Sequence, residues 1–409
     1  MNIDHRKLGR ELDLFDSDPL IGAGLPFWLP DGAAARHEVE SYLHELERRA
    51  GYKHVYSPAL GKKQMYELSG HWKNFADDMF PPMVLGGDEL VLRPSLCPHH
   101  ALIFKARQRS YRELPLRIAE IGPMYRAERS GVLGGLSRVR SIQLNDSHIF
   151  CSLDQVGSEV AEVLRLMDVA HRALGLRPSS FQLSLRGDSG KYAGNDEMWE
   201  RASDLLRQAL DHSGVSYQEV PGEAAFYGPK IDVQIEDAAG REWSLSTIQV
   251  DFHMPAQFGL EYVAADGGRE RPVMIHRSLA GSMERLFGYL IEAHQGAFPV
   301  WYAPVQIAVL PVSEDQSAEA SAFARAAVES GLRAEVLFDG SIGGRIRAAA
   351  ERKIPYAAIV GKREAADNLV ALRLRDGRQL PAMPAAEAIA LISSAAADSQ
   401  AGVDVLARP

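Results

Sequence analysis

The stretch "RPVMIHRSLAGSMERLFGYLIEAH", residues 271 to 294, predicts a strand that runs through Gly281 into a helix. Apolar residues recur every three or four positions in its second half, which is the pattern of one buried helix face. Arg285 falls in the first turn of this helix, where the helix dipole favours anions. The plainer interpretation is that Glu284 and Arg285 are ordinary surface residues at a helix start, so an anion site needs support from elsewhere.

The segment "IGPMYRAERSGVLGGLSRVRSIQLNDSHIF", residues 121 to 150, supplies further basic residues. It predicts two strands joined by a glycine-rich loop, with Arg126 and Glu128 in the first strand and Arg138 and Arg140 in the second. Guanidinium groups that face one another across such a hairpin suit a polyphosphate, because each can bind two phosphate oxygens. Together with Arg285, they indicate a polyphosphate site.

Two further segments predict an antiparallel sheet. Residues 180 to 186, "SFQLSLR", and residues 230 to 237, "KIDVQIED", alternate apolar and polar side chains, as strands with one buried face do. A long amphipathic helix precedes the first of them. It is expected to begin at a capping box formed by Ser152 and Gln155 and to end at Gly175.

The pattern changes at the proline-containing connector "AFPVWYAPVQ", residues 297 to 306. Beyond it, strand-like and helix-like segments alternate over roughly one hundred residues, which is an ordinary domain size. The sequence therefore predicts an α+β protein, with an antiparallel sheet flanked by helices in residues 1–298 and a small α/β domain in residues 299–409.

Composition narrows the class of protein. The net charge of −9 argues against a protein that coats nucleic acid through its overall field, although residues 345 to 378 are locally basic. The two cysteines, Cys97 and Cys151, make a disulfide framework unexpected. The sequence shows neither a signal peptide nor a bilayer-spanning run, so we expect a cytoplasmic protein without a membrane partner.

Several motifs resemble the threonyl-tRNA synthetases, which are class II aminoacyl-tRNA synthetases. The residues that carry the resemblance are "GYKHVYSPAL" (51–60), "GHWKNF" (70–75), "MYRAERSG" (124–131) with "LSRVRS" (136–141), "FYGPKIDV" (226–233) and "MIHRSLAGSMER" (274–285). The similarity extends from "DHRKLGRELDLF" (4–15) to the last predicted helix. It implies a catalytic core with a six- or seven-stranded antiparallel sheet, followed by an anticodon-binding domain.

The resemblance also implies one zinc ion per chain. His148 taken alone is more simply explained as a buried structural histidine, and the spacing of Cys97, His148 and His276 reveals nothing by itself. The family's zinc ligands match these three residues. Three protein ligands leave one coordination position open, as in zinc sites that bind a substrate. In the family, the amino group and side-chain hydroxyl of threonine occupy the metal.

Other site residues follow from the resemblance by position. Arg126 would hold the α-phosphate and the carboxylate, Glu128 would bind the adenine amino group, and Arg138 and Arg285 would bind the terminal phosphates with magnesium. His71 would activate the terminal hydroxyl of the tRNA. Asp146 and Tyr227 would line the threonine pocket, Lys230 and Gln249 would lie near the ATP and ribose, and Glu364 and Arg373 would read anticodon bases.

The resemblance implies activation of L-threonine with ATP and transfer of threonine to its tRNA, by a homodimer. The sequence departs from the family at Leu96, His99, Gly134, Leu144, Asn145 and Ser244. Three alternatives therefore stay open: an inhibitor-resistant duplicate, a relative that transfers threonine to a different acceptor, and a non-catalytic relative that binds tRNA or regulates. The family's N-terminal editing domains have no counterpart in this sequence, so a separate protein that clears seryl-tRNA is expected as a further partner.

Overall fold

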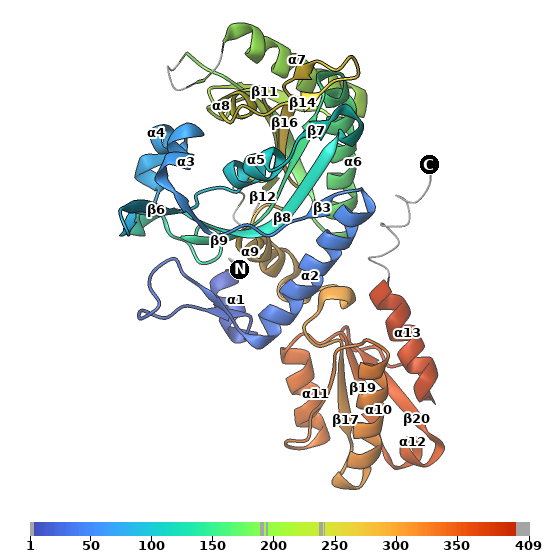
Figure 1. Ribbon diagram of the computed structural model, residues 1–409. Coiled ribbons are helices and arrows are strands. Elements are labelled where there is room, and N and C mark those ends of the chain that lie inside the picture. Colours follow the sequence, from blue (N-terminus) through green and yellow to red (C-terminus); the bar gives the residue numbers. More distant parts are fainter. Residues whose placement is uncertain (1–3, 189–191, 194, 237–239, 241, 398–409) are drawn as a thin grey trace.

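The computed structural model describes residues 4–188, 192–193, 195–236, 240 and 242–397. It contains a larger body with an eight-stranded sheet and a smaller body with a five-stranded sheet (Figure 1). In spatial order the strands of the large sheet are β11 (Tyr217–Pro221), β10 (Pro178–Leu185), β12 (Lys230–Glu236), β13 (Glu242–Asp251), β16 (Val273–Ser278), β9 (Ser141–Cys151), β8 (Leu116–Tyr125) and β3 (Lys53–His54).

The predicted antiparallel sheet is confirmed for the six central strands, from β10 to β8. The two edge strands differ, because β11 and β3 each pair in parallel with their neighbour. The hairpin of β8 and β9 also differs in detail from the prediction. Both strands stop short of Arg126 and Arg140, so the four charged residues Arg126, Glu128, Arg138 and Arg140 lie in the connection between the strands.

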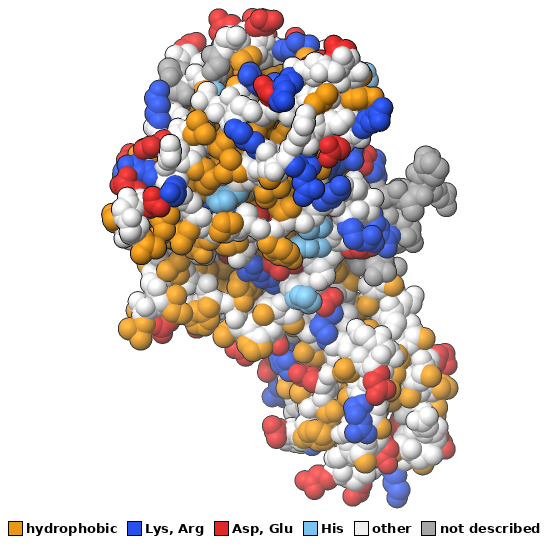
Figure 2. Space-filling view, in the orientation of Figure 1, with side chains coloured by type: hydrophobic (Ala, Val, Ile, Leu, Met, Phe, Trp, Pro, Cys, Tyr) orange, Lys and Arg blue, Asp and Glu red, His pale blue; other side chains and the backbone are white. Residues whose placement is uncertain are grey.

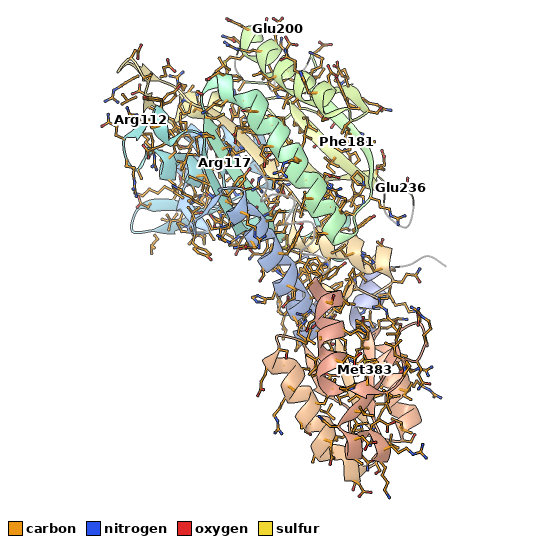
Figure 3. All side chains as sticks on the ribbon, turned by 90° about the vertical axis from the view of Figure 1, so that its right-hand side faces the viewer. Arg112, Arg117, Phe181, Glu200, Glu236 and Met383 are labelled. Atoms are coloured by element: carbon orange, nitrogen blue, oxygen red, sulfur yellow. The ribbon has the colours of Figure 1, made fainter. Side chains whose placement is uncertain are left out.

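Helices cover one face of the large sheet and bury its main apolar core. They are α2 (Pro30–Arg49), α6 (Val156–Leu174), α7 (Asp196–Ser213) and α9 (Met283–His294). Figure 3 shows α6 and α7 side by side over this face. The predicted capping box of Ser152 and Gln155 is present just before α6, and Gly175 ends this helix with a φ of 71°. A left-handed conformation of this kind favours glycine because it has no Cβ.

Shorter elements pack around the sheet and its helices, and the N-terminal helix contacts α9. The helices are α1 (His5–Glu11), α3 (Lys63–Leu68), α4 (His71–Phe75), α5 (Cys97–Lys105) and α8 (His253–Gln257). The small sheets pair β1 (Phe15–Asp16) with β2 (Phe27–Trp28), β6 (Asp88–Leu92) with β4 (Leu60–Lys62) and β5 (Met83–Leu85), and β14 (Tyr262–Val263) with β7 (Arg109–Ser110) and β15 (Arg269–Glu270). No helix within the described ranges is long and apolar enough to cross a bilayer.

Strand alternation places His148 and His276 on the sheet face opposite α6 and α7. Ile149 on β9 and Ile275 on β16 belong to the core beneath those helices. Phe150 and Met274, one position away, belong to a second core formed with α5 and α8. Because side chains alternate between the two faces of a strand, His148 and His276 also face α5. The sheet therefore places both histidines on the same side.

The smaller body has the predicted α/β pattern. Its strands are β17 (Ile307–Pro311), β18 (Ala334–Val336), β19 (Tyr356–Val360), β20 (Leu369–Leu374) and β21 (Met383–Pro384). Its helices are α10 (Ser317–Glu329), α11 (Ile342–Glu351), α12 (Lys362–Asp367) and α13 (Ala385–Ala397). Arg352 joins the two bodies by an ion pair of 3.1 Å with Asp31 on α2.

A buried ion pair fastens α2 to the sheet. Glu47 is fully buried and accepts hydrogen bonds of 2.8 Å from Arg277, from the amide of Asn145 and from the ring of His54. Burial raises the pKa of this carboxyl, but the charge of Arg277 and the three hydrogen bonds outweigh it and hold the pKa at about 2. Removing one member of a buried pair leaves the other charge uncompensated, at a cost of about 3 to 5 kcal/mol.

We therefore expect Glu47→Gln to lower the free energy of unfolding at pH 7 by about 3 kcal/mol or more. Because the folded-state pKa lies below the ordinary value, the stabilisation is present above pH ~4.5 and disappears as the pH falls towards 2. The variant should therefore lose less stability on acidification than the parent. Glu45→Gln is the control, because Glu45 lies on the same helix in half-exposed ion pairs worth about 0 to 1 kcal/mol. Equal urea midpoints for the two variants would contradict the prediction.

Candidate functional site

Three predicted metal ligands from distant parts of the chain meet on the sheet face that carries α5. Cys97 is the first residue of α5, whereas His148 and His276 are paired across β9 and β16. One ligand atom from each lies within 4.8 Å of the other two, and all three residues are buried. The structure therefore brings together the three ligands that the resemblance implied.

Hydrogen bonds to the outer ring nitrogens fix which nitrogen of each histidine faces inward. His276 Nε2 lies 2.9 Å from Asp251 Oδ2, so it carries the proton and leaves Nδ1 as a lone pair. His148 Nδ1 lies 2.7 Å from His100 Nδ1, and His100 Nε2 lies 3.2 Å from Glu120. Glu120 can only accept, so a neutral His100 donates to it and accepts from His148 Nδ1–H. The inward atom of His148 is then also an unprotonated nitrogen.

This arrangement fits a metal ion. The two inward lone pairs, on His148 Nε2 and His276 Nδ1, lie 2.9 Å apart and would repel each other unless a cation lay against both. The outer partners, a carboxylate and a histidine held by a carboxylate, are of the kind that orient metal-binding histidines. Asp146 adds a negative charge, with Oδ2 3.8 Å from His148 Nε2, and burial raises its pKa to about 6. A divalent cation would offset that burial cost.

Two polar residues predicted near the substrates stand in one row with the histidines across the sheet. Strand register pairs Lys230 with Gln249, Gln249 with His276, and His276 with His148. Tyr227 donates a hydrogen bond to Gln249 Oε1, and its ring stacks on His276 with centroids 4.8 Å apart. Tyr227 and Gln249 therefore adjoin the histidine pair, and Lys230 marks the far end of the row.

His71 lies beside the same cluster. Its Nδ1 is 2.8 Å from the hydroxyl of Ser69, which donates to the Tyr66 carbonyl and therefore accepts from His71. The proton of the neutral ring is thus on Nδ1, and Nε2 is the basic nitrogen. Nε2 lies 3.0 Å from Ser95 Oγ and 3.6 Å from Cys97 Sγ. Burial, with a smaller contribution from His276, lowers the pKa of His71 to about 3, so this ring is neutral near pH 7.

The predicted phosphate-binding arginines form a second group. Burial lowers the pKa of Arg285, and the charges of Arg126 and Arg138 lower it further. The surrounding protein also desolvates the Arg126 guanidinium and lowers its pKa, with a smaller contribution from Arg138, although Arg126 is exposed on the surface of the site. Arg285 donates to the carbonyls of Ser137 and Ser244. Within the described part of the chain the Arg126 guanidinium has no hydrogen bond or ion pair, so the group holds excess positive charge.

Glu128 has a partner in this structure. Its carboxylate accepts a hydrogen bond of 2.9 Å from Arg138 Nε, and Arg138 Nη2 forms an ion pair of 2.9 Å with the same oxygen. The predicted adenine-reading residue and the predicted phosphate-binding residue are therefore paired with each other across the β8–β9 connection.

The predicted anticodon residues are not brought together. Arg373 lines a pocket of about 180 Å³ with Arg347 and Arg375, whereas Glu364 lines a different pocket between α10 and α13. Part of the basic stretch is also structural. Arg345 is buried and donates to the carbonyls of Pro311 and Phe338.

The structure gives a physical reason for one departure from the family. Asn145 donates to the buried carboxylate of Glu47 at 2.8 Å, and a carboxylate at position 145 would face that like charge. Ser244 shares a hydrogen bond of 3.0 Å with Gln234, and Leu96 is fully buried beside Cys97. Nothing in the structure explains why Gly134 or Leu144 replaces the usual residue.

Sequence reasoning missed the residues that orient the metal ligands and His71. They are Asp251, His100, Glu120, Ser69 and Ser95. Asp251 could have been suspected, because it lies two positions beyond Gln249 and so shares its face of the strand. The others carried no such signal, since their partners are set by the packing of α4 and α5 on the sheet.

Comparison with known proteins agrees with this architecture. Residues 85–294 match the tRNA synthetase class II core domain (G, H, P, S and T), and residues 306–395 match an anticodon binding domain. The threonine–tRNA ligase of Geobacillus sp. is 49% identical over 90% of this chain, and that of Streptococcus gordonii is 50% identical over 90%. The chain spans 58% of the length of both relatives.

A solved structure extends the comparison. The crystal structure of the RNA binding domain of threonyl-tRNA synthetase from Cryptosporidium parvum Iowa II superposes with a TM-score of 0.91 at 34% identity. The alignment covers 96% of this chain and 98% of that one. The chain therefore belongs to the threonyl-tRNA synthetase family of class II aminoacyl-tRNA synthetases.

Proposed function

We propose that this protein activates L-threonine with ATP and transfers the threonyl group to its tRNA. The observation that carries the proposal is the pair of inward histidine nitrogens beside Cys97, 2.9 Å apart, next to a group of incompletely neutralised arginines. Such a site can hold an amino acid on a metal while a polyphosphate is bound beside it. The relatives named threonine–tRNA ligase support the same activity.

Cys97, His148 and His276 would hold one zinc ion per chain. The metal would supply a Lewis acid that binds the amino group and hydroxyl of threonine. Asp146, on the same strand as His148, would accept the hydrogen bond of the threonine hydroxyl, and Tyr227 would close the pocket against His276. Valine has the shape of threonine but lacks the hydroxyl, so it would leave this polar site unpaired.

ATP would bind along the arginine group with magnesium. Arg126 would hold the α-phosphate and the threonine carboxylate, while Arg138 and Arg285 would hold the terminal phosphates. Glu128 would turn from Arg138 to the adenine amino group, and Lys230 and Gln249 would contact the nucleotide at the end of their row. This reaction requires charge stabilisation and positioning rather than a protein nucleophile.

The second step would use His71 and the C-terminal body. The unprotonated Nε2 of His71 would accept the proton of the terminal tRNA hydroxyl as that hydroxyl attacks the threonyl carbonyl and AMP leaves. We assign residues 1–298 to catalysis and residues 299–409 to anticodon binding. Arg373 and Glu364 remain the proposed anticodon contacts, with Arg373 in the pocket that it shares with Arg347 and Arg375.

A homodimer is the proposed assembly. Of the sixteen large hydrophobic side chains exposed among the described residues, nine lie between Leu20 and Leu85. Tyr56 beside Pro58 is 88% exposed, and Leu20 is 97% exposed. Figure 2 shows hydrophobic side chains gathered on the left of the larger body, where these segments lie. Such a concentration is typical of a surface that another chain covers. We place the dimer in the cytoplasm, with a separate seryl-tRNA deacylase as a further partner.

Two assays on one preparation test the function. We expect threonine-dependent exchange of pyrophosphate into ATP, and charging of purified threonine tRNA with threonine. Exchange without charging would select the alternative in which threonine passes to another acceptor. Absence of threonine-dependent exchange would refute the proposal.

The same exchange assay tests the selectivity for threonine over valine. We expect kcat/KM for valine to be lower than that for threonine by a factor on the order of 10⁴, because valine leaves the polar groups of the site unpaired.

A further inference from the structure

The N-terminal helix α1 reaches the loop that carries the phosphate-binding residues. His5, its first residue, is 8% exposed and lies between that loop and α9. Its Nε2 is 3.1 Å from the backbone nitrogen of Leu136, and its Nδ1 is 2.7 Å from Glu292 on α9. Figure 1 shows α1 beside α9 at the lower edge of the larger body.

The two contacts assign the proton of the ring. A backbone N–H can only donate, so His5 Nε2 accepts from Leu136 and the proton of the neutral ring lies on Nδ1, which donates to Glu292. The backbone N–H of His5 donates to the same carboxylate at 3.2 Å. Asp4 is engaged elsewhere, in hydrogen bonds of 2.7 to 3.1 Å with Arg6. His5 therefore joins the loop to α9 through an uninterrupted hydrogen-bonded path.

The surrounding residues are shaped for this contact. Leu136 is fully buried, and a Cβ on Gly288 of α9 would lie 3.5 Å from Leu136 Cβ and 3.8 Å from His5 Cδ2, so both residues pack against the helix at this point. A Cβ on Gly135 would lie 2.5 Å from His5 Nε2, and the φ of 55° at Gly135 also favours glycine. Arg285, on α9, donates a hydrogen bond of 3.3 Å to the carbonyl of Ser137, the residue that follows Leu136 in the loop. The loop segment just before Arg138 is thus attached to α9 from both sides.

We infer that His5 is a positioning residue for ATP binding, because its Nε2 fixes the loop that presents Arg138 to the nucleotide. The inference rests on the ATP site proposed above. Without the bond to Leu136, the loop segment before Arg138 keeps, among the described residues, the Arg285 hydrogen bond and the packing of Leu136 as its contacts with α9, so Arg138 is held less firmly. Loss of the His5 contact should weaken ATP binding without affecting the threonine pocket.

Two amide substitutions separate the two hydrogen bonds of the ring. His5→Gln places an amide oxygen near the position of Nε2 and can accept from Leu136. His5→Asn places an amide near the position of Nδ1, so it can donate to Glu292 but cannot reach Leu136. We expect His5→Asn to raise the KM for ATP in the exchange reaction roughly 3- to 10-fold, the size expected for one net hydrogen bond. The KM for threonine should stay within about twofold, and His5→Gln should retain most of the affinity for ATP.

A second readout does not depend on activity. The loop contains Arg126, Arg129, Arg138 and Arg140, so limited trypsin digestion followed by mass spectrometry reports how firmly it is held. Cleavage within the loop should be faster in His5→Asn than in the parent and in His5→Gln, at equal melting temperatures. Equal cleavage and equal KM values for the parent and both variants, or a Gln variant as impaired as the Asn variant, would overturn the inference. If the parent shows no exchange, the proposed function fails, whereas the cleavage pattern still decides the role of His5.

Discussion

Cys97→Ser is expected to release the proposed zinc ion and to reduce threonine-dependent exchange by about 10³-fold or more. A metal that binds a substrate contributes several kcal/mol to the reaction, and each 1.36 kcal/mol is a factor of ten. A serine hydroxyl is almost isosteric with the thiol but does not ionise to give a thiolate ligand. Zinc content by mass spectrometry and the visible spectrum of the cobalt-substituted protein measure the loss directly.

The chain contains its own control for this substitution. Cys151 is the only other cysteine, it is also fully buried, and it lies on the helix-covered face of β9, away from the ligands. Cys151→Ser should cost stability but should keep one zinc per chain and most of the exchange rate. His276→Ala should behave like Cys97→Ser. Full zinc content in either ligand variant, or loss of zinc in both serine variants, would contradict the assignment.

The sequence predicted helix ends correctly where they depend only on interactions between neighbouring residues. The capping box of Ser152 and Gln155 and the left-handed Gly175 depend only on neighbouring residues, and both are present. Alternating strands predicted the antiparallel centre of the sheet. The parallel edges β11 and β3 carried no such signal, because strand direction depends on how distant segments connect.

The β8–β9 connection shows where local reasoning fails. Arg126 and Arg138 looked like strand residues, but the glycines between them allow a turn and a single bridge from Gly134 to Arg138 instead of a continued ladder. The hairpin was predicted correctly, and its charged residues were placed in the wrong element. Their position in a loop gives them freedom to approach a ligand, and the hydrogen bonds of His5 to Leu136 and Glu292 limit that freedom.

The site itself was beyond sequence reasoning without the family resemblance. Cys97, His148 and His276 are separated by 51 and 128 residues, and only the register of β9 with β16 and the packing of α5 bring them together. The partners Asp251, His100 and Glu120 depend on the same register. Conversely, Arg345 looked like part of a basic surface but is buried, because its guanidinium satisfies two backbone carbonyls.

Replacement of Arg126 is expected to cause the second large loss of exchange activity. Its guanidinium has no partner among the described residues, yet it interacts electrostatically with His71, Tyr227 and Arg285, which surround both halves of the site. A cation in this position would stabilise the charge that develops on the α-phosphate, and removing one such donor costs about 10² to 10³ in kcat. We therefore expect Arg126→Ala to lose exchange activity by that factor while retaining zinc.

Arg126→Lys and Arg129→Ala complete the test. Lysine keeps the charge but cannot bind two oxygens in a planar fork, so Arg126→Lys should recover only part of the rate. Arg129 lies in the same loop and is exposed, and we assign it no role in the site, so Arg129→Ala should stay within about twofold of the parent, as neutral surface substitutions do. If Arg126→Ala were as active as Arg129→Ala, the α-phosphate would have to be held by another residue. If Arg126→Ala also lost its zinc, the substitution would disturb the metal ligands as well as the arginine group. The loss of exchange activity could then not be assigned to the guanidinium alone.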